Sequence, residues 1–114
     1  MMNVYKKFLD CLFKISKDES YFKFLLKNHI YFLINIFIIS NENKLNYEKI
    51  CKKFVPKFVS RSTVKSILNE GVRKKFIEKY SLRNNKKNKY YKLSNIAKKN
   101  LNYWVECQKE IFNK

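Results

Sequence analysis

The side chains best suited to chemistry in this sequence are basic and polar ones, and they gather in one segment. Residues 57–92 carry 12 Lys or Arg side chains and 2 acidic ones, whereas the complete chain of 114 residues carries 26 and 9. More than half of the net charge of +17 therefore lies in less than a third of the sequence. Such a concentration of positive charge is the electrostatic footprint of a surface that binds nucleic-acid phosphates.

Residues 61–74 within this segment have the period of an amphipathic helix. Its apolar face consists of Val64, Ile67, Leu68 and Val72. The polar positions are Ser60, which is placed to cap the first turn, then Arg61, Ser62, Thr63, Lys65, Ser66, Asn69 and Arg73. Arg and Lys donate to guanine and Asn bonds adenine twice, at about 1–3 kcal/mol for a good bidentate contact. We predict that this helix reads base edges in the major groove of double-stranded DNA, with Arg61, Ser62 and Lys65 foremost; an ordinary solvated face is the alternative.

Residues 76–93 change to the alternating pattern of two antiparallel strands. We expect a first strand that ends at residue 82 or 83, a polar tip over 83–89 and a return strand over 90–93. The tip contains Asn84, Asn85 and Asn88, a residue type that tolerates a left-handed backbone. Its cations are Arg83, Lys86, Lys87 and Lys89. We predict that they bind the DNA backbone or the minor groove, with a lysine-rich surface loop as the alternative.

The rest of the chain has the pattern of helices that would hold these two segments. Helices are predicted over residues 4–15, over 21–27 and 29–39 with a break at Asn28, over 47–54, and from 95 almost to the C-terminus. Asn28, Asn46 and Ser94 are placed to cap three of them, and Pro56 closes the short one. The inward residues of that short helix would be Ile50, Cys51 and Phe54.

The order of these elements predicts one domain over residues 1–114. A single Gly and a single Pro argue against barrels and sandwiches, which need many tight turns. The expected fold is mainly α with a small β-hairpin wing: a winged helix-turn-helix over 28–93, with extra helices in 1–27 and 94–114.

No group of residues has the pattern of an active site. His29, the only histidine, borders an apolar run and suits a structural role better than catalysis. Cys11, Cys51 and Cys107 are odd in number and widely spaced, which argues against a disulfide framework or a zinc site. We therefore expect no enzyme activity, no cofactor and no metal, and leave a redox role of the thiols open.

Three short segments carry a family resemblance: Ser62-Thr63-Val64, Phe76-Ile77-Glu78-Lys79 and Tyr91-Lys92-Leu93-Ser94. Over residues 28–101 the chain resembles the MarR/SarA-type winged-helix transcription regulators. The resemblance implies a homodimer whose first and last helices interlock. It also implies that the two recognition helices enter successive major grooves of a palindromic operator.

The terminal helices carry more apolar surface than a small winged-helix core covers. The residues concerned are Val4, Phe8, Leu12 and Ile15 near one end, and Trp104, Val105, Ile111 and Phe112 near the other. A homodimer through these residues would place two recognition helices about 34 Å apart, which is one turn of B-DNA. Packing of the two ends against each other within one chain is the alternative.

The remaining patterns bear on location and on rival functions. The longest apolar stretch, residues 30–39, is half of the roughly 20 residues that span a bilayer, and the charged N-terminus lacks a signal-peptide pattern. We expect a cytoplasmic, nucleoid-associated protein with no membrane partner; the sequence names no effector. Three rivals stay open: architectural binding of DNA or RNA, coating of anionic membranes by residues 4–15, and a protein-interaction module whose lysines reflect codon bias.

Overall fold

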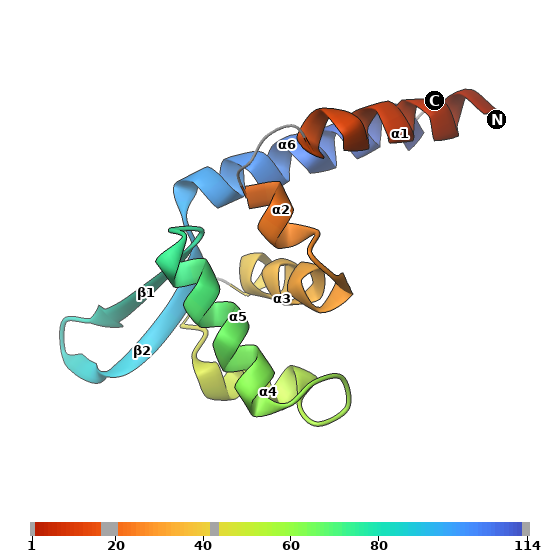
Figure 1. Ribbon diagram of the computed structural model, residues 1–114. Helices are drawn as coiled ribbons and strands as arrows, with labels where there is room; N and C mark the ends of the chain where they lie inside the picture. The colour runs from red at the N-terminus through yellow and green to blue at the C-terminus, as the bar shows by residue number, and fades with distance from the viewer. Residues whose placement is uncertain (1, 17–20, 42–43, 113–114) are drawn as a thin grey trace.

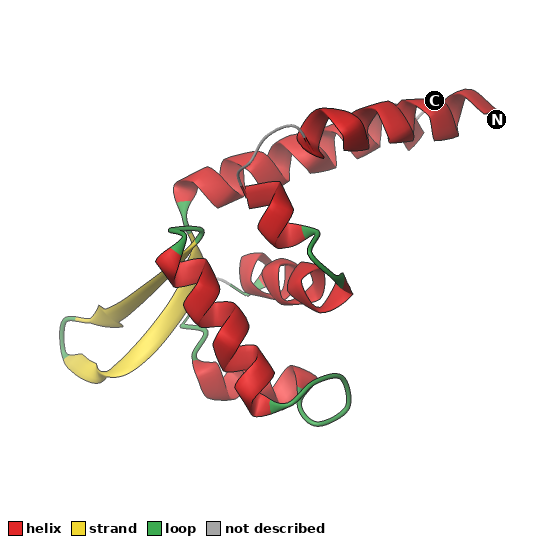
Figure 2. Cartoon of the chain, viewed as in Figure 1, coloured by secondary structure: helices red, strands yellow, loops and turns green. Residues whose placement is uncertain are grey.

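The computed structural model describes residues 2–16, 21–41 and 44–112 of the chain. Within this part the elements are α1 (Met2–Ser16), α2 (Tyr21–Leu25), α3 (His29–Ser40), α4 (Tyr47–Phe54), α5 (Arg61–Arg73), β1 (Ile77–Leu82), β2 (Asn85–Leu93) and α6 (Asn95–Phe112). The structure is mainly α with one antiparallel hairpin (Figures 1 and 2). This arrangement is a winged helix-turn-helix with an added helix at each end, which confirms the predicted fold class.

The helices begin where the sequence places a capping side chain. Asn28, Asn46, Ser60 and Ser94 each accept a hydrogen bond from a backbone N–H two or three residues further on, at 2.8–3.2 Å. Such a bond satisfies one of the donors that the first helical turn leaves unpaired. The break at Asn28 between α2 and α3 is therefore confirmed, as are the predicted starts of α4, α5 and α6.

The core lies around α3, which is covered by α2, α5, α6 and the hairpin. Ile34 and Ile38 of α3 are fully buried, together with apolar side chains from every one of those neighbours. The one fully buried amide in this core, Asn35, accepts a hydrogen bond from the Tyr21 hydroxyl at 2.9 Å and donates to the Tyr31 carbonyl oxygen at 2.8 Å. Because its polar atoms are paired, Asn35 fixes α2 against α3 instead of destabilising the core.

The end of α5 is shaped by two backbone features. The Phe76 N–H donates to the Gly71 carbonyl oxygen at 2.9 Å and the Lys75 N–H donates to that of Val72 at 3.1 Å, which is a Schellman motif. Lys75 occupies the left-handed position of the motif, with φ of 65°. Gly71 leaves room for the hairpin, because a Cβ there would come within 2.8 Å of Cγ1 of Ile77. These features turn the chain from α5 directly into β1.

The hairpin differs from the prediction at its tip. The turn consists of residues 83 and 84 alone, and β2 begins at Asn85, so the expected tip over 83–89 was wrong. The pairs Tyr80–Tyr90 and Leu82–Asn85 are two residues apart on β1 but five apart on β2, so residues 86–89 form an irregular, bulged stretch. A bulge breaks the alternation of side chains, which is why the sequence pattern did not show the strand there.

The backbone of the tip was also predicted incorrectly. Asn84, Asn85 and Asn88 were expected to supply left-handed conformations. Within the described residues, however, only Lys44 and Lys75 among the non-glycine residues have a positive φ. The base of the hairpin is tied to the body instead, because the Tyr91 N–H donates to the Leu45 carbonyl oxygen at 2.8 Å.

The terminal helices α1 and α6 lie side by side and form an arm that extends from the body, with both chain ends at the same end of it (Figure 1). Cys11 of α1 is buried, and its sulfur lies 3.9 Å from Nε2 of Gln108 on α6. The Trp104 ring packs edge-on against Phe32 of α3, with ring centroids 5.7 Å apart. The two ends therefore pack against each other within one chain, as the alternative interpretation held.

Packing of α1 on α6 decides which apolar residues of the arm are left uncovered. Val4, Phe8 and Trp104 are half-buried, whereas Val105 is exposed. The side chains of Leu12, Ile15, Ile111 and Phe112 lie outside the described part. The exposed apolar residues of α1 are Tyr5, Leu9 and Phe13, at 72%, 48% and 60% exposure and four residues apart. These three residues, here called the α1 stripe, were not among the predicted interface residues.

Candidate nucleic-acid interface

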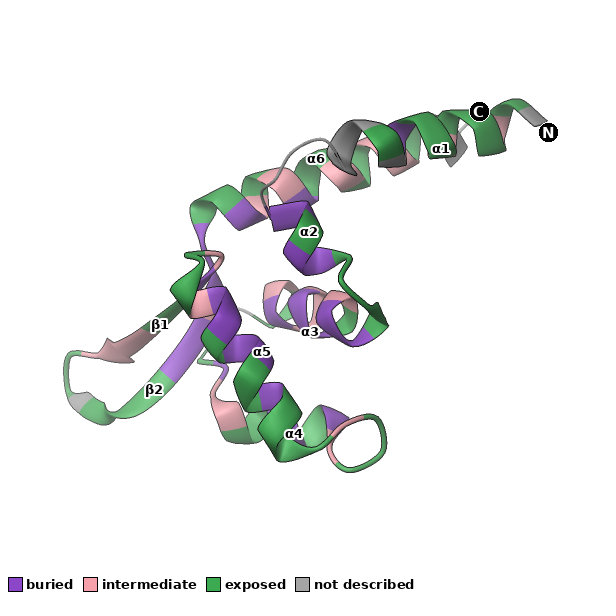
Figure 3. Ribbon diagram, viewed as in Figure 1, coloured by how far each residue is buried: buried purple, intermediate pink, exposed green. Residues whose placement is uncertain are grey.

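The outward face of α5 carries the polar residues that the sequence assigned to it. Val64, Ile67 and Leu68 are buried and Val72 is half-buried, so the apolar side of the helix is attached to the core. The opposite side is solvent-exposed at Ser60, Arg61, Ser62, Thr63, Lys65, Ser66, Asn69 and Arg73 (Figure 3). The division of the helix into a buried and an exposed face is thus as predicted, while contact with DNA stays a prediction.

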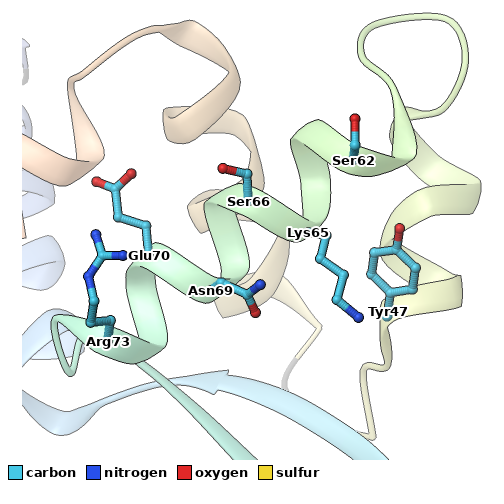
Figure 4. A pocket seen from close by; sticks show the side chains of 7 residues that line it. All are labelled: Tyr47, Ser62, Lys65, Ser66, Asn69, Glu70 and Arg73. Carbon is cyan, nitrogen blue, oxygen red and sulfur yellow. The ribbon is translucent and has the colours of Figure 1, made fainter.

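A shallow hollow of about 510 Å³ runs along this face (Figure 4). It is lined by Tyr47 of α4 and by Ser62, Lys65, Ser66, Asn69, Glu70 and Arg73 of α5. In Figure 4, Lys65 and Asn69 extend from the side of α5 that faces Tyr47, whereas Ser66 and Glu70 extend from the other side. The face therefore presents hydrogen-bond donors and acceptors along most of the length of the helix.

Arg61 is not a free cation at the start of this face. Its guanidinium forms an ion pair with the Glu48 carboxylate of α4 and lies 5.2 Å from the centre of the Tyr47 ring. The hydrogen bond that Arg61 donates to the Glu48 carboxylate raises the pKa of Arg61 above its ordinary value. The Tyr47 hydroxyl donates to the Arg61 carbonyl oxygen at 2.9 Å, and the Lys65 ammonium lies 5.4 Å from the same ring. Sequence reasoning placed Arg61 among the three foremost residues and missed its partner, because Glu48 lies 13 residues earlier.

Glu70 is the second residue that sequence reasoning missed. Its side chain is only 11% exposed and lies on α5 between the buried and the outward faces. It accepts hydrogen bonds from the Tyr31 hydroxyl at 2.8 Å, from Lys74 at 3.1 Å and from Lys27 at 3.4 Å. Burial on its own raises the pKa of this carboxyl, but the three donors outweigh burial and hold the pKa below its ordinary value. Glu70 thereby anchors α5 to α3 and to the segment that follows α2.

The hairpin carries a second group of cations. Arg83, Lys86, Lys87 and Lys89 are all exposed, and β1 packs against α5 at the base of the ribbon (Figure 1). Tyr91 of β2 lies at this base, and the Lys79 ammonium lies 5.9 Å from its ring. Burial raises the pKa of Tyr91, and the positive charge of Lys65 on α5 opposes that rise. The outward face of α5 and the base of the ribbon are therefore neighbours.

The residues considered for other chemistry are dispersed. His29 is exposed at the start of α3, and Cys11, Cys51 and Cys107 are not joined by disulfide bonds. In the part of the chain that the structure describes, no three His, Cys, Asp or Glu side chains are grouped so that they could hold a metal ion. None of the helices in the same part is both long and apolar enough to cross a membrane.

Comparisons with known proteins add nothing to this geometry. No protein-family model matches the chain, and no curated protein or solved structure is significantly similar to it. The arrangement of the side chains is therefore the basis for assigning a function.

Proposed function

We propose that the protein binds double-stranded DNA in a sequence-specific manner, as a small homodimeric transcription regulator. The observation that carries this proposal is the exposed polar face of α5, next to a ribbon with four exposed cations at Arg83, Lys86, Lys87 and Lys89. In this arrangement α5 enters the major groove, while the ribbon binds the phosphate backbone or the adjacent minor groove.

The dimensions of α5 suit a major groove. An α-helix with its side chains is about 10–12 Å wide, and the major groove of B-DNA is about 12 Å wide. From Ser62 to Arg73 the helix rises about 16 Å, at about 1.5 Å per residue, and this length corresponds to about five base pairs. Lys65 and Asn69, whose side chains share one side of the helix, are the best placed to donate to guanine and to bond adenine (Figure 4).

In the proposed homodimer the two copies contact each other through the arm of α1 and α6. The α1 stripe exposes Tyr5, Leu9 and Phe13 along one side of α1, and Val105 is exposed on α6. An exposed row of large apolar side chains of this kind marks a protein interface. A twofold axis through the arm would let two copies of α5 enter the DNA one helical turn apart, about 34 Å.

The first test is the salt dependence of binding to genomic DNA fragments selected by the protein. If the dimer neutralises about six to ten phosphates, its affinity for duplex DNA should fall by about 10³ to 10⁵ between 50 and 200 mM salt. The selected duplex is compared with a random duplex and with an RNA hairpin. Equal affinity for both duplexes would show that the protein binds DNA without sequence preference, as an architectural protein does. No binding to either duplex or to the RNA hairpin would refute the proposal.

The second test separates the roles of α5 and the ribbon. Substitution of Lys86, Lys87 and Lys89 by Ala should weaken selected and random DNA alike and lower the salt slope by about 3 for each protomer, which is about 6 for the dimer. Asn69→Ala should weaken only the selected sequence, by about 1–3 kcal/mol. The matched control replaces Lys6, Lys99 and Lys109, three exposed lysines of the arm, and should leave both affinities unchanged. Equal losses in the ribbon and the arm variants would show that charge alone drives binding.

A further inference from the structure

The surroundings of Arg61 distinguish it from the other cations of the candidate interface. Its guanidinium is held from two directions by α4, through the ion pair with Glu48 and through its position 5.2 Å from the centre of the Tyr47 ring. Lys65, Arg73 and the four ribbon cations have no acidic partner among the described residues. A guanidinium has five N–H donors, so Arg61 keeps donors available for DNA while Glu48 and Tyr47 set its position.

We propose that Glu48 is a specificity-determining residue of the DNA interface, which holds the Arg61 guanidinium in position for a base edge in the major groove and restricts its access to phosphates that lie in other directions. This inference rests on the proposed function. It assigns a role to a residue on α4 that does not itself contact a base. Glu48 acts through Arg61 and is a positioning residue.

The directions of the competing contacts support this role. The side chains of Arg61 and Glu48 are 52% and 69% exposed, so their ion pair contributes little to stability, while it restricts the position of the guanidinium. A bidentate contact to guanine supplies two directed hydrogen bonds and needs the guanidinium in one orientation, whereas a phosphate contact carries no sequence information. A guanidinium held in place by Glu48 therefore suits a guanine in front of it better than phosphates that lie in other directions.

The geometry also gives Glu48 a second effect in the same direction. A hollow of about 420 Å³ next to the ion pair is lined by Asn46, Glu48, Lys49, Cys51, Lys52, Val55 and Arg61. Phosphates that approach this side of α4 meet the Glu48 carboxylate together with the lysines. Like charges repel, so Glu48 lowers the affinity for DNA that is bound only through its backbone.

The test is Glu48→Gln, which keeps the size of the side chain and removes its charge. We expect its affinity for random duplex DNA to rise about fivefold, its affinity for the selected duplex to rise less than about twofold, and its specificity ratio to fall accordingly. Because Glu48 is exposed, the substitution should leave the unfolding transition unchanged. The salt slope on random DNA should steepen by about 1, as expected for one additional phosphate contact.

Two comparisons isolate the role of Arg61. Glu78→Gln on β1 is the matched control, because Glu78 is also exposed and paired with a cation, Lys92 at 3.8 Å. It should raise the affinities for both duplexes by the same factor and leave the specificity ratio unchanged. In an Arg61→Ala background, Glu48→Gln should change the specificity ratio clearly less, because only the repulsion between Glu48 and phosphates then remains.

The outcomes distinguish this inference from the function on which it rests. A wild-type protein that binds no DNA overturns the proposed function and the role of Glu48 with it. A wild-type protein that binds selectively, with Glu48→Gln and Glu78→Gln indistinguishable, overturns only the role of Glu48. An effect of Glu48→Gln on the specificity ratio that is equally large without Arg61 overturns it as well, since Glu48 would then act through its charge alone.

Discussion

The basic unit of α4, α5 and the hairpin differs from the arm of α1 and α6 in what each leaves exposed. On the basic unit the exposed side chains are mostly cationic or polar, with Phe58 as the main large apolar exception. On α1 the exposed large apolar side chains are those of the α1 stripe. On the first surface most cations lack an acidic partner among the described residues, and on the second the apolar residues lack cover. The two surfaces therefore suit different partners, a polyanion and a protein.

The two regions also differ in how their positions are fixed. The basic unit is joined to the core by buried apolar side chains of α5, by the Glu70 cluster and by the backbone bond from Tyr91 to Leu45. Within the described part, the arm is joined to the body mainly at its base, through Ala97, Leu101 and Trp104 in the first half of α6 and through its contacts with α2. A helix that must meet the regular spacing of base pairs needs such a rigid attachment, whereas an arm that packs on a second copy gains its final support from that copy.

The largest effect is expected from replacing the α1 stripe. Substitution of Tyr5, Leu9 and Phe13 by Ser should convert the dimer into a monomer, because the apolar area that joins the two copies is lost. Light scattering would measure the mass. Exposed positions contribute about 0.5 kcal/mol or less to the folding of one chain, so the circular dichroism spectrum should not change.

Three neighbouring exposed positions of α1 provide the control for this experiment. Ser at Asn3, Lys6 and Asp10 changes the same helix to the same extent but leaves the stripe intact, and this variant should stay dimeric. A wild-type protein that is monomeric at all concentrations would contradict the assignment of the arm to a second copy of the chain.

A smaller effect is expected at Gly71, where α5 meets the hairpin. Gly71→Ala should lower the free energy of unfolding by about 1–3 kcal/mol, since the new methyl group would overlap the Ile77 side chain and approach Cζ of Phe24 at 3.0 Å. Urea denaturation measures the change. Ser66→Ala on the exposed face of α5 is the control and should not destabilise, because Ala favours helices. An unchanged stability of Gly71→Ala would mean that the hairpin is free to shift away from α5.

Sequence reasoning succeeded where a structural feature depends on a few neighbouring residues. The capping residues Asn28, Asn46, Ser60 and Ser94 mark helix starts because their side chains bond to N–H groups two or three positions away. The two faces of α5 follow from its period in the same way. The fold class followed from the order of these local features.

Sequence reasoning failed where a feature depends on packing between distant residues. The ion pair of Glu48 with Arg61 and the cluster of Glu70 with Tyr31 join different helices, so no spacing along the chain indicates them. The α1 stripe was missed for a similar reason, because both faces of α1 carry apolar residues. Only the position of α6 decides that Val4 and Phe8 are half-covered while Leu9 stays exposed.

The Glu70 cluster predicts how the attachment of α5 responds to acid. The pKa of Glu70 is lower in the folded chain than in the unfolded chain, so its carboxylate stabilises the fold above the ordinary Glu range. This stabilisation is lost as the pH falls through the folded pKa. Glu70→Gln should therefore cost about 1–2 kcal/mol at neutral pH and flatten the acid limb of the stability profile.

Urea denaturation between pH 7 and pH 3 would measure this profile for Glu70→Gln and for Glu78→Gln. Glu78 is half exposed and has one partner, Lys92, at 3.8 Å, so its variant should keep the acid limb of the wild type. Parallel profiles of the wild type and the Glu70 variant would show that the three donors around Glu70 do not stabilise its charge.

The smallest effect is expected at the turn between α5 and β1, where the structure places a lysine in a backbone conformation that favours glycine. Lys75 has φ of 65°, and a side chain in this region costs about 1 kcal/mol. Lys75→Gly should therefore raise the free energy of unfolding by about 0.5–1 kcal/mol, although glycine is the more flexible residue in the unfolded chain.

The adjacent lysine tests this explanation with the same change in charge. Lys74 has an ordinary helical conformation, with φ of −84°, and its ammonium donates to Glu70 at 3.1 Å. Lys74→Gly should therefore destabilise the protein, so that the two neighbouring substitutions shift the urea midpoint in opposite directions. If both variants were destabilised, the left-handed turn would not be strained by Lys75. The connection from α5 to the hairpin would then owe its geometry to the close packing at Gly71 alone.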